Sequence, residues 1–100
     1  MIYYTQLIFV KKGLEADFNA FEAKVLPLLK DHGGDLMYRI RPHENDFIEA
    51  SGELPYEVHL VSFPGKAHFE AYRDDPNRLA FMGLKNGSIE KAVLIEGVAI

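Results

Sequence analysis

The order of extended and helical segments narrows the possible folds of this chain more than any other feature. Residues 2–10 are rich in β-branched and aromatic types, which favour strands. Three further short apolar runs bounded by turn residues occur at 35–41, 56–63 and 92–100. Four strands are therefore predicted, with helical patterns between the first and second and between the third and fourth.

The longest helix is predicted over residues 14–31, after the first strand. Gly33-Gly34 supplies its stop, because glycine accepts the left-handed conformation past a helix C-terminus. Pro27 lacks an amide hydrogen, so the helix is expected to kink or break near it. The apolar positions at helical spacing are Leu14, Phe18, Phe21, Val25 and Leu28.

Two shorter helical segments precede the last strand. The first opens at Pro64, and the second begins with Asp75 as N-cap and Pro76 in the first turn. Asn86-Gly87 is expected to end the second. The resulting order is strand, helix, strand, strand, helix, strand. This order predicts an α+β, ferredoxin-like βαββαβ fold, a four-stranded antiparallel sheet with helices on one face.

The composition of the chain limits which binding partners and which cellular compartment are expected for the protein. No linker divides residues 1–100, so one domain is expected. The chain has 11 Lys and Arg against 15 Asp and Glu, without the basic excess of nucleic-acid or membrane-surface proteins. It lacks a long apolar run and the basic flank of a signal peptide, so a cytoplasmic protein with no membrane partner is expected. Absence of cysteine excludes disulfides and thiolate metal sites, and the polar turn 43–46 lacks recognised metal-ligand spacing.

The strands are apolar on both faces. Leu7 and Phe9 lie on one face of the first strand, and Ile8 and Val10 lie on the other. Helices can cover only one face of this sheet. A second copy of the chain is the simplest cover for the other face, so a homodimer is expected.

Strand parity gives a first assignment of the two faces. The alternate positions of the second and third strands that are nearly all apolar are expected to meet the helices; they are Leu36, Tyr38, Ile40, Val58 and Leu60. The opposite face is mostly apolar but contains Gln6, Arg39, His59 and Glu96. The favoured interpretation is a dimer interface with a buried polar network, and the alternative is a ligand cavity.

His59 is the strongest candidate for acid–base chemistry, because imidazole titrates near neutral pH. The second and third strands are consecutive and are expected to pair antiparallel. One register places Arg39 opposite His59 and Arg41 opposite Glu57, while neighbouring registers exchange these partners. Arg39 and His59 are the candidate catalytic residues. The alternative is a hydrogen-bonded structural histidine.

Short sequence features spread over nearly the whole chain resemble a known superfamily. They are Gly33-Gly34 before a strand with Arg39, Phe63-Pro64 closing the third strand, Tyr72 followed by Asp75-Pro76, and Glu96-Gly97. With these features the chain resembles the dimeric α+β barrel superfamily, and more narrowly a branch catalogued as a domain of unknown function. The resemblance implies a homodimer whose two sheets pack into a barrel. More distant kin are antibiotic-biosynthesis monooxygenases, haem-degrading enzymes and muconolactone-type isomerases.

The resemblance also implies a pocket between helices and sheet, where His68 and Tyr72, four residues apart on one helix, would share a face. The candidate ligand-binding residues are Gln6, Tyr38, His68, Tyr72 and Glu96. Monooxygenase and haem-degrading relatives use a Trp that this chain does not have. Two function classes stay open. One is a cofactor-independent oxygenase- or isomerase-type enzyme acting on a small apolar or aromatic molecule, and the other is a non-catalytic dimeric binding or structural module.

Overall fold

A computed structural model describes all 100 residues as one layer of helices on one antiparallel sheet. The strands are β1 (Ile2–Val10), β2 (Asp35–Ile40), β3 (Glu57–Phe63) and β4 (Ile89–Gly97). The helices are α1 (Glu15–Val25), α2 (Lys66–Arg73), α3 (Pro76–Leu79) and α4 (Met82–Ser88). Two 3-10 helices, η1 (Leu26–His32) and η2 (Glu44–Asp46), complete the secondary structure.

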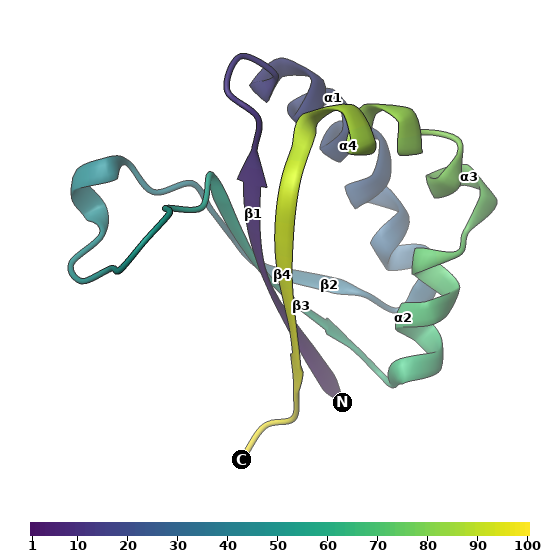
Figure 1. The fold of residues 1–100 in the computed structure, drawn as a ribbon. Coiled ribbons are helices and arrows are strands. Elements are labelled where there is room, and N and C mark those ends of the chain that lie inside the picture. Colours follow the sequence, from purple (N-terminus) through teal and green to yellow (C-terminus); the bar gives the residue numbers. More distant parts are fainter.

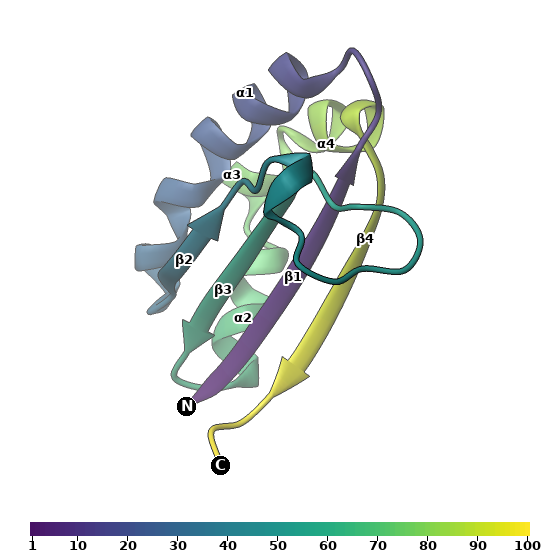
Figure 2. The same ribbon diagram turned by 90° about the vertical axis from the view of Figure 1, so that its left-hand side faces the viewer.

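The sheet has the strand order β2-β3-β1-β4, with all neighbours antiparallel. All four α-helices lie on the same side of it (Figure 1). The turned view shows the four strands side by side, with the connection between β2 and β3 projecting on the side away from the helices (Figure 2). The ferredoxin-like α+β fold predicted from the element order is confirmed.

The first helix changes character at the expected proline. α1 ends at Val25, and the chain continues as the 3-10 helix η1, with Pro27 in its first turn. Gly33 then ends η1 with a φ of 73°, the left-handed conformation that glycine accepts. The tighter 3-10 turn places Leu29 in the core, where continued α-helical spacing favoured Leu28. The predicted break is confirmed, and Leu28 is only partly buried.

The second helical region follows its predicted start but not its predicted end. Asp75 caps α3, and its side chain accepts a hydrogen bond of 2.8 Å from the Asn77 amide. α4 continues through Gly87 to Ser88, whose hydroxyl donates to the Leu84 carbonyl at 2.6 Å. β4 then begins at once at Ile89, three residues earlier than the expected start.

The predicted assignment of the sheet faces is wrong. The buried residues of β3 are Glu57, His59, Val61, Phe63 and, at one end, Ser62, so the odd-numbered positions meet the helices. Val58 and Leu60 alternate with them on the open face, and Tyr38 and Ile40 are 59% and 50% exposed. Of the residues expected under the helices, only Leu36 packs against the core.

Two physical causes explain the error. Both parities of these strands are apolar enough to be buried, so hydropathy alone did not distinguish them. In addition, the register shifts between Leu36 and Tyr38, and such a bulge reverses strand parity beyond it. Leu36 and Arg39 therefore share the helix-covered face although their numbers differ in parity.

Gly34 packs closely against Phe63 and Leu29 beside the core, which leaves no room for a side chain. A Cβ atom on Gly34 would lie 2.8 Å from Cε1 of Phe63 and 3.0 Å from the carbonyl oxygen of Leu29, both in the packed interior. Gly34→Ala is expected to lower the free energy of unfolding by about 2 kcal/mol, because neither neighbour can move freely. Gly83→Ala, in open space on α4, is the control and should raise it by about 0.5–1 kcal/mol. Urea unfolding checks both changes, and equal stabilities for Gly34→Ala and wild type would contradict the argument.

Candidate functional site

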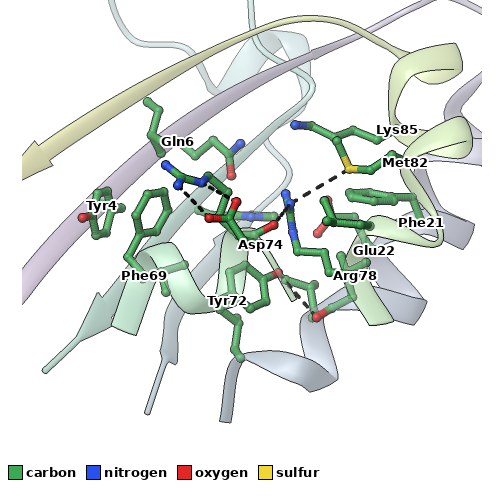
Figure 3. A pocket seen from close by; sticks show the side chains of 18 of the residues that line it. Tyr4, Gln6, Phe21, Glu22, Phe69, Tyr72, Asp74, Arg78, Met82 and Lys85 are labelled. Atoms are coloured by element: carbon green, nitrogen blue, oxygen red, sulfur yellow. Dashed lines mark hydrogen bonds and ion pairs between the residues drawn. The ribbon is translucent and has the colours of Figure 1, made fainter. Parts of the chain in front are cut away.

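A cavity of about 330 Å³ lies between the sheet and the helices (Figure 3). Its size suits a small organic molecule. The walls are mainly apolar, with contributions from β1, β3 and β4 on one side and α1, η1 and α2–α4 on the other. The polar and charged side chains in the walls are Tyr4, Gln6, Glu22, His59, Tyr72, Arg73, Asp74, Arg78 and Lys85.

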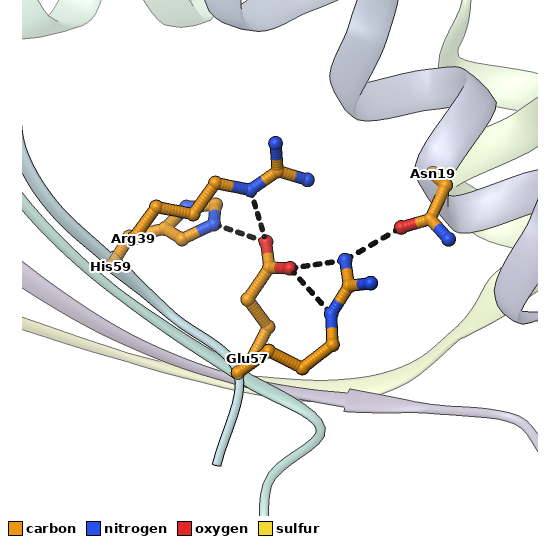
Figure 4. A network of polar contacts seen from close by, with 5 residues as sticks. Asn19, Arg39, Glu57 and His59 are labelled. Carbon is orange, nitrogen blue, oxygen red and sulfur yellow. Dashed lines mark hydrogen bonds and ion pairs between the residues drawn. The ribbon is translucent and has the colours of Figure 1, made fainter.

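Next to this cavity, a buried carboxylate collects three cationic or hydrogen-bonding side chains (Figure 4). Glu57 is only 1% exposed. Its Oε1 accepts from Nη2 of Arg41 at 2.6 Å, and its Oε2 accepts from Nε of Arg39 at 3.0 Å. Nε2 of His59 lies 2.5 Å from Oε2. Arg41 also donates to the side-chain oxygen of Asn19 on α1 at 2.7 Å, which ties the cluster to the helix layer.

The pairing of β2 with β3 assembles this cluster. Arg39 is the register partner of His59, one of the registers that the sequence left open, and this confirms the expectation that the two residues lie close together on one face. Residues two apart on a strand point to the same face, so Glu57 and His59 lie next to each other on β3. Arg41, just beyond the end of β2, then reaches the same carboxylate.

The surroundings of Glu57 favour its charged form. Burial on its own would raise the pKa of this carboxyl group. The hydrogen bonds from His59, Arg41 and Arg39 outweigh burial and lower the pKa to about 2. Glu57 is therefore an ionised hydrogen-bond acceptor at neutral pH.

This acceptor orients the imidazole of His59. An ionised carboxylate can only accept, so Nε2 of His59 must carry the hydrogen that it shares with Glu57. In a neutral ring the lone pair then lies on Nδ1, which makes no hydrogen bond within the protein. His59 lines the cavity and is 2% exposed. The arrangement can take a proton from a bound molecule, as in other carboxylate-oriented histidines.

Glu22 on α1, a residue not predicted from the sequence, joins His59 in the cavity wall. One carboxylate oxygen of Glu22 lies within 4.8 Å of the His59 and Glu57 atoms, and the residue is 5% exposed. Burial raises the pKa of Glu22, although the attraction of His59 opposes this shift. The sequence does contain a signal that Glu22 is buried. Glu22 follows Phe18 by four residues and precedes Val25 by three, so it shares the apolar face of its helix with them.

Glu22, Glu57 and His59 form the one cluster whose atoms converge closely enough to hold a metal ion. Both oxygens of Glu57 already accept hydrogen bonds from arginine, and its Oε2 also contacts His59. A divalent cation would have to share this carboxylate with two guanidinium groups, which repel it. The donor set therefore fits proton transfer better than metal binding.

The structure separates the residues predicted for the site. His59, Gln6 and Tyr72 line the cavity. Arg39 does not line it and contacts His59's partner Glu57 instead. The interpretation of this polar face as a dimer interface is wrong, because the helices cover it.

The other three predicted ligand-binding residues lie outside the cavity. Tyr38 is on the open face of the sheet, and His68 is an exposed residue of α2. Glu96 accepts a hydrogen bond of 2.9 Å from the hydroxyl of Tyr4 and is partly exposed. Tyr4 itself lines the cavity.

No family model and no curated protein matches this sequence. Solved structures match its fold. A protein of unknown function from Rhodopseudomonas palustris has a TM-score of 0.83 at 16% identity, over 99% of this chain and 82% of that one. A dimeric ferredoxin-like protein of unknown function from Jannaschia sp. has a TM-score of 0.72 at 18% identity, over 98% of both chains.

A third structural neighbour is a protein from Nitrosomonas europaea described as a candidate antibiotic biosynthesis monooxygenase. Its TM-score is 0.73 at 10% identity, over 100% of this chain and 99% of that one. Identities this low show the fold alone. No helix of the chain has both the length and the apolar character needed to span a bilayer.

Proposed function

We propose that this chain is a cofactor-independent, isomerase-type enzyme that transfers protons on a small apolar or aromatic molecule. The observation that carries the proposal is the Glu57–His59 pair in the wall of a largely apolar cavity. Nδ1 of His59 accepts a proton from a carbon next to a carbonyl group, which leaves an enolate. The imidazolium exchanges its proton with solvent and then returns one proton to a different atom of the substrate, so no electrons are exchanged and no co-reactant is consumed.

Glu22 is placed to assist this step. Burial raises the pKa of its carboxyl group, so this carboxyl holds a proton more readily than an exposed one does. A neutral carboxylic acid can donate a hydrogen bond to the oxygen on which negative charge develops. Its oxygen atom near His59 puts donor and base on the same side of the cavity.

The test uses phenylacetone, an aromatic ketone with exchangeable protons, in heavy water. Wild-type protein is expected to accelerate deuterium incorporation next to the carbonyl, followed by proton NMR. His59→Gln should lower the accelerated rate by a factor of about 100 or more, the usual contribution of a general base. His43→Gln, in the exposed connection between β2 and β3, is the control and should leave the rate unchanged.

The alternative function is a non-catalytic small-molecule-binding module with the same cavity. It predicts that phenylacetone binds without any accelerated exchange, and that His59→Gln alters the affinity only slightly. Thermal-shift titration of the same variants measures this binding. Binding without exchange would reject the enzyme proposal.

We also propose that the protein works as a homodimer through the open face of its sheet. Apolar side chains gather there without cover: Tyr38 and Ile40 from β2 are joined by Val93 and Ile95 from β4, which are 42% and 52% exposed. Leu60 lies between these strands, opposite Thr5 of β1. A continuous apolar face of four strands is unusual for a monomer. The dimeric Jannaschia neighbour with the same fold supports the proposal.

A further inference from the structure

Arg78 lies in the cavity wall, and the hydrogen bonds of its guanidinium group involve only Nη1, which carries two of its five N–H donors. Its Nη1 donates to the backbone carbonyl of Arg73 at 3.0 Å and contacts the sulfur of Met82 at 4.0 Å. Nε and Nη2 form none of the well-aligned hydrogen bonds of the chain, although the hydroxyl of Tyr72 is a polar neighbour of the guanidinium group. The Nε atom is the one buried side-chain nitrogen or oxygen in the chain without a partner. Buried donors are nearly always satisfied, so this orphan indicates an acceptor from outside the chain.

Aromatic rings hold the guanidinium group in place. Its central carbon lies 5.2 Å from the ring centroid of Tyr72 and 5.9 Å from that of Phe21. Both residues also line the cavity, and Figure 3 shows Arg78 among them. Contacts of this kind fix the plane of the group, so its unused edge is preorganised.

The charges around Arg78 leave it without a carboxylate partner. Asp74 is engaged by Arg73 in a two-pronged pair, with both distances 2.9 Å, and Asp75 is engaged by His32 at 2.8 Å. Glu22 forms no ion pair with Arg78, and burial raises its pKa although the attractions of His59 and Arg78 oppose this shift. Lys85 adds a second cationic group to the same wall. Burial lowers the pKa of Lys85 most, the repulsion of Arg78 lowers it further, and the attraction of Glu22 opposes both effects.

We propose that Arg78 is an anion subsite of the cavity and that the ligand is a small apolar molecule carrying a carboxylate. The Nε–Nη2 edge of a guanidinium group matches the two oxygens of a carboxylate and binds it with two parallel hydrogen bonds. Phe21, Val25, Phe63 and Phe69 provide the apolar surface for the remainder of the molecule. This inference rests on the proposed function only for the reaction that follows binding.

The test compares two probes of nearly equal size and shape, hydrocinnamate and its neutral amide, hydrocinnamide. Titrations followed by NMR measure the dissociation constant of each. Wild-type protein is expected to bind the carboxylate at least about tenfold more tightly than the amide, as for one charge-assisted bidentate contact. Arg78→Met keeps an apolar stem and should reduce this ratio to about one. Arg78→Lys keeps the charge without the fork and should give an intermediate ratio.

Lys12→Gln is the control, since it removes one positive charge from an exposed turn outside the cavity wall and should preserve the ratio. Equal binding of the two probes by wild type, no binding of the carboxylate, or an unchanged ratio in Arg78→Met would overturn the proposal. If Arg78→Met does not fold, the wild-type comparison and Arg78→Lys still decide it. His59→Gln should retain the carboxylate preference, so failure of the anion subsite and failure of the proton-transfer reaction give different results.

Discussion

Glu57→Gln is expected to lower the free energy of unfolding by about 3 kcal/mol. The carboxylate of Glu57 is almost completely buried and neutralises two arginines at once. Glutamine keeps the size of the side chain but loses the charge, so Arg39 and Arg41 keep their positive charges without a counterion. Removing one partner of a buried ion pair usually costs about 3–5 kcal/mol, and the partial exposure of both arginines favours the lower end. Urea unfolding at neutral pH measures the change.

Glu53→Gln provides the matched control. Glu53 pairs with Lys91 at 2.8 Å, and both side chains are more than half exposed. Exposed pairs contribute about 0–1 kcal/mol, so this substitution should have a small effect. Similar losses of stability in the two variants would refute the central role of the Glu57 cluster.

Glu57→Gln should also change how the free energy of unfolding depends on pH. The pKa of Glu57 is about 2 in the folded protein against an ordinary value of 4.5, so its charged form stabilises the fold. That contribution is complete above the ordinary pKa and is lost as pH falls from about 4.5 toward 2. The stability difference between wild type and Glu57→Gln should therefore shrink over this range. A difference that stays constant down to low pH would contradict the assigned ionisation.

Leu60→Asp is expected to convert a dimer into a monomer. Leu60 lies near the middle of the open face, between Thr5 of β1 and Tyr38 of β2. A specific dimer through this face should bury roughly 1,200 Å² or more, and an unpaired carboxylate inside it would cost several kcal/mol. A loss of about 3 kcal/mol weakens the dimer more than about 100-fold. Sedimentation at micromolar concentration should give twice the chain mass of 11.3 kDa for wild type and the single mass for the variant.

Ile48→Asp is the control for this experiment. Ile48 is fully exposed in the connection between β2 and β3, and it lies outside the four strands. The variant should remain dimeric, and circular dichroism should show that both variants are folded. A wild-type monomer, or a Leu60→Asp variant that stays dimeric, would reject the open face as the interface.

Local sequence signals determined most of the fold. Pro27 removes an amide donor and Gly33 accepts a positive φ, so the helix break and its stop follow from covalent structure. The Asp75 cap follows in the same way from a side chain bonding to the nearby Asn77 amide. The Arg39–His59 pairing was also accessible, because charge pairing and the strand order favour a small set of registers.

The amino-acid sequence by itself therefore determined the order of the elements, the helix boundaries near strong signals and the pairing of β2 with β3. Only the tertiary structure decided which sheet face the helices cover, because both parities are apolar and the bulge at Leu36/Tyr38 depends on packing. Because the helices cover the face that carries His59, this face forms a cavity wall and not the expected dimer interface. It also brought Glu22 and Arg78 to His59's side of the sheet, since these residues are distant along the chain and only helix packing sets their separation. Local periodicity carries no information on such contacts.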